Sequence, residues 1–256
     1  MKYIIRINIA IAFFCIASFE QAEAQFTPSP WEMGINTGSL IYQGDLSKSK
    51  LGYMRSLKPA LGFYVSKSLD DFFAVRADLV LGSIGANEAT YSSPAWRKYR
   101  GFSFQSSITE LSGEMEYFLL GDAGGNAVGK FSPYVFAGVG FSLLHIKRNW
   151  SGINTAYFGA QSQAVIGLGE DTLHKVPWII PVIPLGLGVK YVLTQKLSLR
   201  AELMYRLTGT DYLDGFKYAG NPKTNDYFYS FTLGVSYRFG HNRLSCPRIP
   251  RQPKFN

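Results

Sequence analysis

Cysteine, histidine and charged residues are all scarce in this sequence. Its 256 residues include two Cys and three His, and charged side chains make up 17% of the total. So few thiols and imidazoles argue against a disulfide scaffold and against a metal centre built from Cys and His. No run of about 18 apolar residues occurs either, so the sequence predicts no transmembrane helix.

Aromatic residues and glycine, by contrast, are abundant. The chain carries 16 Tyr, 19 Phe and 26 Gly, aromatic residues reach 15%, and hydrophobic residues reach 46%. This hydrophobic content excludes a disordered chain. A helical bundle would be rich in Ala, Glu, Lys and Leu, so the composition instead favours aromatic-rich strands joined by glycine-containing turns.

The start of the chain has the features of an export signal. Two basic residues precede a short, mostly apolar stretch over residues 7–19, and Ala22-Glu23-Ala24 is a small-x-small cleavage site. We therefore expect a signal peptide over residues 1–24, cleaved between Ala24 and Gln25. The alternative interpretation is a buried helix of a cytosolic protein.

Eight segments of the remaining chain alternate, with a period of two residues, between apolar side chains and polar or small ones. Such alternation has two physical solutions. A water-soluble barrel or sandwich buries the apolar face, whereas a transmembrane barrel turns that face outward to lipid. The segments cover residues 31–41, 61–66, 73–82, 110–119, 131–143, 185–191, 197–206 and 227–239.

Two features favour the transmembrane solution. Several segments reach the roughly 9–11 residues that a tilted strand needs to cross a bilayer. Aromatic residues also stand near the segment ends, where the girdles at the two membrane interfaces require them. These aromatic residues are Trp31, Tyr42, Tyr191, Tyr205, Tyr227 and Phe239. A lipocalin-like soluble barrel remains the alternative.

Backbone chemistry then requires the strands to form a ring. Inside hydrocarbon every N–H and C=O group must be paired, so a sheet with open edges is not viable. The sequence therefore predicts an all-β fold, an eight-stranded, antiparallel, up-and-down transmembrane β-barrel over residues 25–240. We expect this barrel to lie in the cell outer membrane, with the membrane lipid as its direct partner.

A barrel of eight strands is narrow enough for side chains to fill its interior. The face opposite the apolar one carries five basic and six acidic residues, whose charges nearly cancel. We expect these residues to form a cross-strand ion-pair network that plugs the lumen, so that the barrel is not a conducting pore. They are Glu32, Arg76, Asp78, Glu110, Glu114, Glu116, Lys190, Arg200, Glu202, Arg206 and Arg238.

The connections between segments alternate in length, as in outer-membrane barrels, where short turns face the periplasm and long loops face outward. The largest loop, residues 145–177, is expected to be either functional or a disordered surface loop. The tail over residues 241–256 is basic and contains proline, so it is either a periplasmic contact arm for an acidic partner or a disordered solubilising tail. Nucleic acid is not expected as a partner, because an exported barrel rarely meets it.

The chain offers little catalytic chemistry. Ser142 and His145 are three residues apart, which places them on opposite faces of a strand, and no acid accompanies them. We therefore expect no catalytic residue, no cofactor, no metal site and no enzymatic activity. A small barrel enzyme acting on lipids and a surface adhesion barrel acting through its long loops remain the alternatives.

Four stretches, taken in their order and spacing, carry a family resemblance. They are WEMG at 31–34 with YQGDL at 42–46, FSPYVFAGVG at 131–140, PLGLGVKY at 184–191, and Arg206 followed by TDYLD at 210–214. Together they resemble the PorG-like outer-membrane barrels of Bacteroidota, a family long labelled as a domain of unknown function. The resemblance covers essentially the whole mature chain. It implies a non-enzymatic component of the type IX secretion machinery, whose partners are periplasmic ring proteins beneath the outer membrane.

Two of these stretches open outer loops on the same rim of the predicted barrel. Asp45 stands at the start of the first long loop, and Asp211, Tyr212 and Asp214 stand at the start of the fourth. We expect these four residues to form a rim cluster that orders both loops. Ordinary turn chemistry is the alternative, because Gly-Asp and Asp-Gly sequences favour turns in any case.

Overall fold

The structure of this chain is a computed structural model that describes residues 31–49, 52–53, 56–220 and 225–239. The predicted signal peptide, its cleavage between Ala24 and Gln25, and the basic tail over residues 241–256 lie outside the described residues. The fold below is that of the segment between them.

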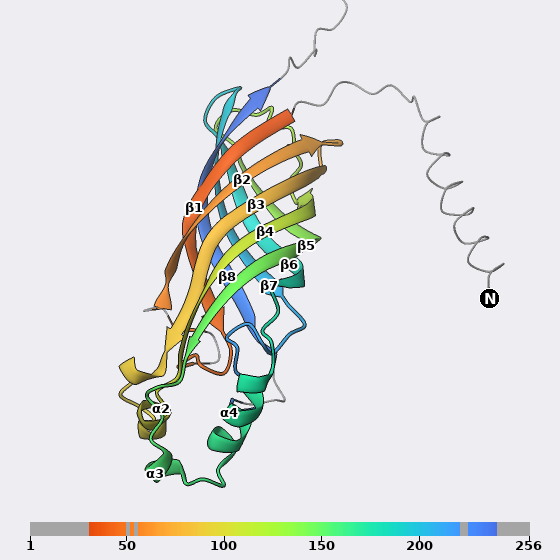
Figure 1. The fold of residues 1–256 in the computed structure, drawn as a ribbon. Helices are drawn as coiled ribbons and strands as arrows, with labels where there is room; N and C mark the ends of the chain where they lie inside the picture. The colour runs from red at the N-terminus through yellow and green to blue at the C-terminus, as the bar shows by residue number, and fades with distance from the viewer. Residues whose placement is uncertain (1–30, 50–51, 54–55, 221–224, 240–256) are drawn as a thin grey trace, which may run out of the picture. The chain divides into compact units, whose positions relative to one another are not determined.

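Eight antiparallel strands close into a barrel, in which each strand pairs with its neighbours in sequence and β1 pairs with β8 (Figure 1). This arrangement confirms the predicted eight-stranded, up-and-down fold. The strands are β1 (Trp31–Gln43), β2 (Lys58–Ser68), β3 (Phe73–Asn87), β4 (Ser103–Phe118), β5 (Phe131–Asn149), β6 (Ile179–Val192), β7 (Leu197–Leu207) and β8 (Tyr227–Phe239).

The outer wall of the barrel is apolar and its inner wall is polar. On β4 and β5, Leu111, Val139 and Phe141 are 62%, 70% and 60% exposed. The intervening Glu110 and Glu114 on β4 are 0% and 4% exposed. Lipid requires this arrangement and water disfavours it, so the barrel spans a membrane and the soluble alternative is wrong. Its even number of antiparallel strands is that of the outer-membrane type, which places the protein in the outer membrane.

The connections differ between the two ends of the barrel. The β2–β3 and β6–β7 turns are short, whereas the helices of the described chain lie together at the opposite end (Figure 1). Short turns and long loops therefore alternate, as predicted, and the long loops mark the outer end. No helix in the described part of the chain is long and apolar enough to cross a membrane. The helices are η3 (Glu88–Thr90), α2 (Ala95–Arg100), α3 (Thr155–Phe158) and α4 (Gln163–Leu173).

The strands beside the second and third outer loops are longer than the sequence predicts. β4 begins at Ser103, earlier than the predicted segment, and β5 continues to Asn149, so the third loop does not begin at residue 145. The outward positions of these extensions hold polar residues, such as the exposed Gln105 and Lys147. Their inward positions hold apolar residues instead, such as Phe104 and Leu144, so the alternation changes phase where the strands leave the hydrocarbon and the outward apolar stripe does not mark the extensions.

The third loop also contains helices that the sequence analysis did not predict. The Asn154 side chain accepts a hydrogen bond from the Tyr157 N–H at the start of α3, and the Ser162 side chain accepts one from the Val165 N–H at the start of α4. Such caps satisfy N–H groups that have no partner within the helix. The loop is therefore locally structured.

Tyr42 is not a girdle residue, and its prediction as one was wrong. It is 1% exposed and points into the barrel, where its ring packs edge-on against Phe104 with the centroids 4.7 Å apart. Tyr42 is ten residues from the inward-facing Glu32 on the same strand, so the period of two places both on the inner face. The phenol group of Tyr42 is therefore buried inside the outer end of the barrel.

Candidate functional site

The eleven charged residues predicted for the lumen all lie on the inner wall and are at most 6% exposed. Along β4 the inward positions run from Phe104 and Ile108 near the outer end, through the glutamates, to Phe118 near the periplasmic end. The charges therefore form a layer between apolar side chains. The members of this ionic layer are Glu32, Arg76, Asp78, Glu110, Glu114, Glu116, Lys190, Arg200, Glu202, Arg206 and Arg238.

Arg76 on β3 is the most highly connected member of the ionic layer. Its Nε donates to Glu114 Oε2 at 2.9 Å, and its Nη1 lies 2.6 Å from Glu202 Oε1 and 3.0 Å from Glu116 Oε1. Asp78 lies 3.5 Å away from the same guanidinium. The planar fork of arginine can meet several carboxylates at once, so one side chain joins strands on opposite sides of the barrel.

Arg200 on β7 forms a second centre. Its Nη1 lies 2.6 Å from Glu116 Oε1, and its Nη2 lies 2.9 Å from Glu32 Oε1. Lys190 on β6 donates to the other oxygen of Glu32 at 2.5 Å. Because Glu116 contacts Arg76 as well as Arg200, the two centres are one connected network.

Arg206 and Arg238 stand apart from these centres. Arg206 binds Glu110 at 2.8 Å, and the Ser142 hydroxyl donates to the same carboxylate at 2.9 Å. Arg238 instead donates through Nη2 to the Gly125 carbonyl in the β4–β5 turn. The ionic layer therefore reaches from the periplasmic turn towards the outer half of the barrel.

The energetics of this layer are those of buried ion pairs. Removing two charges from water costs several kcal/mol per ion, which their attraction offsets only when the geometry is good. The network is therefore weak as a source of net stability but costly to break, since a lost partner leaves a buried charge behind. Aromatic faces add to the packing, with Phe136 4.8 Å from the Arg76 guanidinium and Tyr64 4.8 Å from that of Arg200.

At the outer mouth, the three predicted rim aspartates lie around Tyr42. The Tyr42 hydroxyl is 2.7 Å from Asp214 Oδ2 and also 2.7 Å from Asp226 Oδ1. Asp45 lies against the fourth loop, where a side chain at Gly220 would meet its carboxylate at 2.5 Å. Asp211 is 5% exposed, and neither of its carboxylate oxygens has a hydrogen-bond partner among the described residues.

The structure places Tyr212 differently from the three aspartates. Its ring stacks on the imidazole of His174 with the centroids 6.2 Å apart, so it contacts the third loop. Asp226 belongs to the cluster in place of Tyr212. The sequence analysis missed Asp226 because this residue stands alone directly before a strand. Asp226 Oδ2 accepts the Leu213 and Asp214 N–H groups at 3.2 and 3.4 Å, which orders the fourth loop.

The geometry of this cluster requires one of the two carboxyl groups beside Tyr42, that of Asp214 or that of Asp226, to hold a proton. A phenol carries one hydrogen and can donate to only one of two carboxylates. The second carboxyl at 2.7 Å from Tyr42 must therefore be protonated and donate to the phenol oxygen. Burial, with the nearby Asp211 and Asp45 charges, raises the pKa of Asp226 to about 8, and burial with Asp45 and Asp214 raises that of Asp211 to about 7.

Two further buried charges join the outer loops, and sequence reasoning missed both. Asp171 of α4 accepts the Lys217, Tyr218 and Ala219 N–H groups of the fourth loop at 3.2, 3.1 and 2.9 Å. Arg100 of α2 pairs with Glu88 at 2.6 Å and donates to the Ala219 carbonyl at 3.1 Å. The second, third and fourth loops thus meet at one short segment, which has no motif that the sequence could reveal.

The structure separates the only serine and histidine considered as a catalytic pair. Ser142 faces the lumen and is 0% exposed, whereas His145 is exposed on the outer wall. Their side chains therefore lie on opposite faces of β5 and cannot act together. Among the described residues, no group of three or more His, Cys, Asp or Glu side chains is placed to hold a metal ion.

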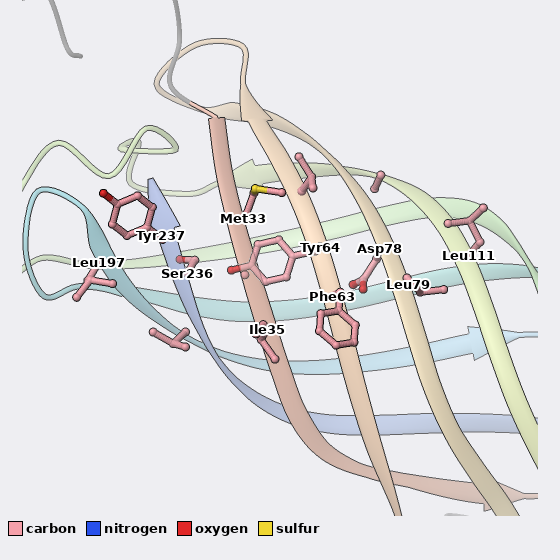
Figure 2. Close-up of a pocket in the computed structure, with 14 residues that line it drawn as sticks. Met33, Ile35, Phe63, Tyr64, Asp78, Leu79, Leu111, Leu197, Ser236 and Tyr237 are labelled. Carbon is pink, nitrogen blue, oxygen red and sulfur yellow. The ribbon is translucent and has the colours of Figure 1, made fainter. Parts of the chain in front are cut away.

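A shallow apolar hollow of about 560 Å³ lies on the wall near the short turns (Figure 2). Its outward lining residues include Met33, Ile35 and Phe63, which are 49%, 49% and 40% exposed. Tyr64 and Asp78, also labelled in Figure 2, belong to the inward set behind it. The hollow is on the lipid-facing side of the wall, where we expect acyl chains to fill it.

Comparisons with known proteins give one family and several solved structures. A family model described as "Domain of unknown function (DUF6089)" matches residues 7–248. Similar solved structures include Ail, the attachment invasion locus protein of Yersinia pestis, with 10% identity over 82% of this chain and 99% of that chain and a TM-score of 0.43. Neisserial surface protein A has 12% identity over 82% of this chain and 97% of that chain, with a TM-score of 0.43. The outer membrane enzyme PagL has 10% identity over 80% of this chain and 97% of that chain, with a TM-score of 0.36. No curated protein matches the sequence.

Proposed function

This chain belongs to the DUF6089 family, and from that premise and its ionic lumen we propose that it is a non-enzymatic component of the type IX secretion machinery. In this proposal the barrel is an anchor in the outer membrane. It acts by binding other components, and neither transports a solute nor transforms a substrate.

The observation that carries the proposal is the filled lumen. Arg76, Arg200 and their carboxylates occupy the middle of the barrel, and apolar side chains occupy it towards both ends. A solute would have to break several buried ion pairs to pass, at a cost of about 3–5 kcal/mol for each partner removed. In this proposal, the protein therefore acts through binding surfaces at the two ends of the barrel, on either side of the membrane.

Periplasmic ring proteins are the proposed partners, on the ground of the resemblance to PorG-like barrels. Among the described residues, the β4–β5 turn is the longest periplasmic connection, and its residues 126–129 are exposed. Its shape is set from within, because Asp122 accepts the Asn126 and Ala127 N–H groups and Lys190 donates to the Ala123 carbonyl at 3.1 Å. A turn fixed in this way can present a preformed binding surface.

Site-specific cross-linking in the native envelope tests this proposal. A photoreactive residue replaces Val128 in the β4–β5 turn, where the side chain is 55% exposed. The matched control replaces Leu173 of the third outer loop, which is 85% exposed. We expect the ring proteins to be captured from position 128 and not from position 173. Capture of no ring protein from position 128, or equal capture from both positions, would contradict the proposal.

A further inference from the structure

A second groove lies on the outer wall of the barrel, at the level of the strand extensions and away from the ionic layer. It measures about 550 Å³. Lys58 of β2 and Lys147 of β5 contribute to its lining, together with Gln105 of β4 between them. The amide side chains of Asn87 and Asn149 also line it, and hydroxyl residues and Arg148 contribute to the same lining. The two lysines and the three amide residues define what we call the headgroup groove.

Strand register gives the height of this groove in the membrane. Gln105 pairs with Gly85 of β3 on one side and with Lys147 on the other, in one outward row. The uppermost row that still carries leucine is Leu81, Thr109 and Leu143, four residues nearer the periplasm on each strand. At about 3.3 Å per residue and a tilt of about 40°, the groove lies roughly 10 Å above that row. This is the level of lipid headgroups, because the polar layer begins where the apolar belt ends.

The charge of the groove is positive. Neither Lys58 nor Lys147 forms a hydrogen bond or ion pair with another described residue, and no described carboxylate lines the groove. The nearby Glu88 is 0% exposed and its carboxylate is occupied by Arg100 at 2.6 Å. Two ammonium groups therefore face the headgroup layer without a protein anion to neutralise them.

We propose that the headgroup groove binds the phosphate-bearing headgroup of an anionic glycolipid in the outer leaflet. Lys58 and Lys147 pair with the phosphate, since ammonium groups bind phosphate as point charges. The amides of Asn87, Gln105 and Asn149 supply donors and acceptors for sugar hydroxyls. The site depends only on the membrane-spanning fold and stands whether or not the barrel serves secretion.

Lipid retention by the full chain in nanodiscs tests the proposal. Nanodiscs of phosphatidylcholine contain a small fraction either of bisphosphorylated lipid A or of the same lipid A with both phosphates removed. After exchange against discs of phosphatidylcholine alone, the lipid A that stays with the protein is counted by mass spectrometry. We expect the phosphorylated form to be retained and the dephosphorylated form to be lost. The double variant Lys58→Glu, Lys147→Glu should lower retention of the phosphorylated form by roughly tenfold or more.

Two controls separate this site from general charge and from misfolding. Lys98→Glu makes the same charge change on an exposed lysine of α2 outside the groove, and it should retain lipid as the unaltered protein does. Folding of each variant is checked by the gel mobility of unheated samples, and Lys58→Gln, Lys147→Gln replaces the double variant if that one does not fold. Equal retention of both forms of lipid A would overturn the proposal, as would equal loss in Lys98→Glu and the double variant. Displacement by inorganic phosphate without any preference for the lipid would also overturn it.

Discussion

Arg76 joins carboxylates from strands on opposite sides of the closed lumen. Its inward direction follows from the sequence, because every second residue of a strand faces the same side. Its partners do not follow, since Glu202 is 126 residues away and meets Arg76 only across the closed lumen. Such contacts depend on the stagger of the strands around the ring, which no local pattern encodes.

Replacing Arg76 with Met should therefore destabilise the barrel strongly. The change keeps an apolar stem but leaves Glu114, Glu116 and Glu202 without this cation, and the expected loss is about 3–5 kcal/mol. Urea unfolding in lipid vesicles, followed by tryptophan fluorescence, measures it. The added change Glu114→Gln should recover part of the loss, because it removes one of the carboxylates left unpaired. A loss below about 1 kcal/mol in the single variant would show that water or other groups already satisfy these carboxylates.

The carboxyl cluster at the outer mouth should make the fourth loop sensitive to pH. The pKa of Asp226 is raised to about 8 and that of Asp211 to about 7, whereas a carboxyl in an open loop ionises near 4. The closed loop thus binds more protons than the open loop in this range. Its stability is fully present below about pH 4 and is lost as the pH rises through about 7–8.

Hydrogen exchange of the backbone over residues 210–220, measured at pH 5, 7 and 9 and corrected for the intrinsic exchange rate, tests this dependence. Protection should be highest at pH 5 and lowest at pH 9. In Asp226→Asn the dependence on pH should be weaker, because a carboxyl that must hold a proton is gone. Protection that rises towards pH 9 would contradict the shared proton between Tyr42, Asp214 and Asp226.

At the scale of elements, the strands could be predicted from the sequence and the outer loops could not. The outward apolar stripe identifies a strand wherever one face meets lipid, as in β3 and β8. It stops at the outer ends of β4 and β5, where the outward positions are polar and apolar residues such as Phe104 and Leu144 face inward. The helices of the third loop have no such stripe, because α4 is short and its buried residues are Gly167 and Asp171. The contact between α4 and the fourth loop is long-range and has no sequence signal.

Asp171→Asn should detach α4 from the fourth loop. The carboxylate accepts three N–H groups with two oxygens, whereas an amide offers one oxygen and turns two N–H donors towards them. Loop opening should become easier by about 1–3 kcal/mol, seen as faster hydrogen exchange at residues 217–219. Glu170→Gln, which changes an exposed neighbour in the same way, is the matched control. Equal exchange in both variants would mean that Asp171 does not hold the loop.

For the whole molecule, the closed barrel divides the chain into surfaces with different solvents. Lipid faces the apolar wall, the ionic layer fills the interior, and the two ends are left for other contacts. The fold class was predictable because hydrocarbon forces every strand edge to be paired, which makes a ring the outcome of the alternation. The binding partners of the two ends could not be predicted from the alternation of apolar and polar residues, because loops and turns have no such alternation.

Conductance of the purified barrel in a planar lipid bilayer shows whether the ionic layer seals the lumen. Insertion of the folded protein should give no large, stable open channel, because Arg76, Arg200 and their carboxylates fill the passage through the barrel. Stable, porin-like conductance steps from the unaltered protein would contradict it.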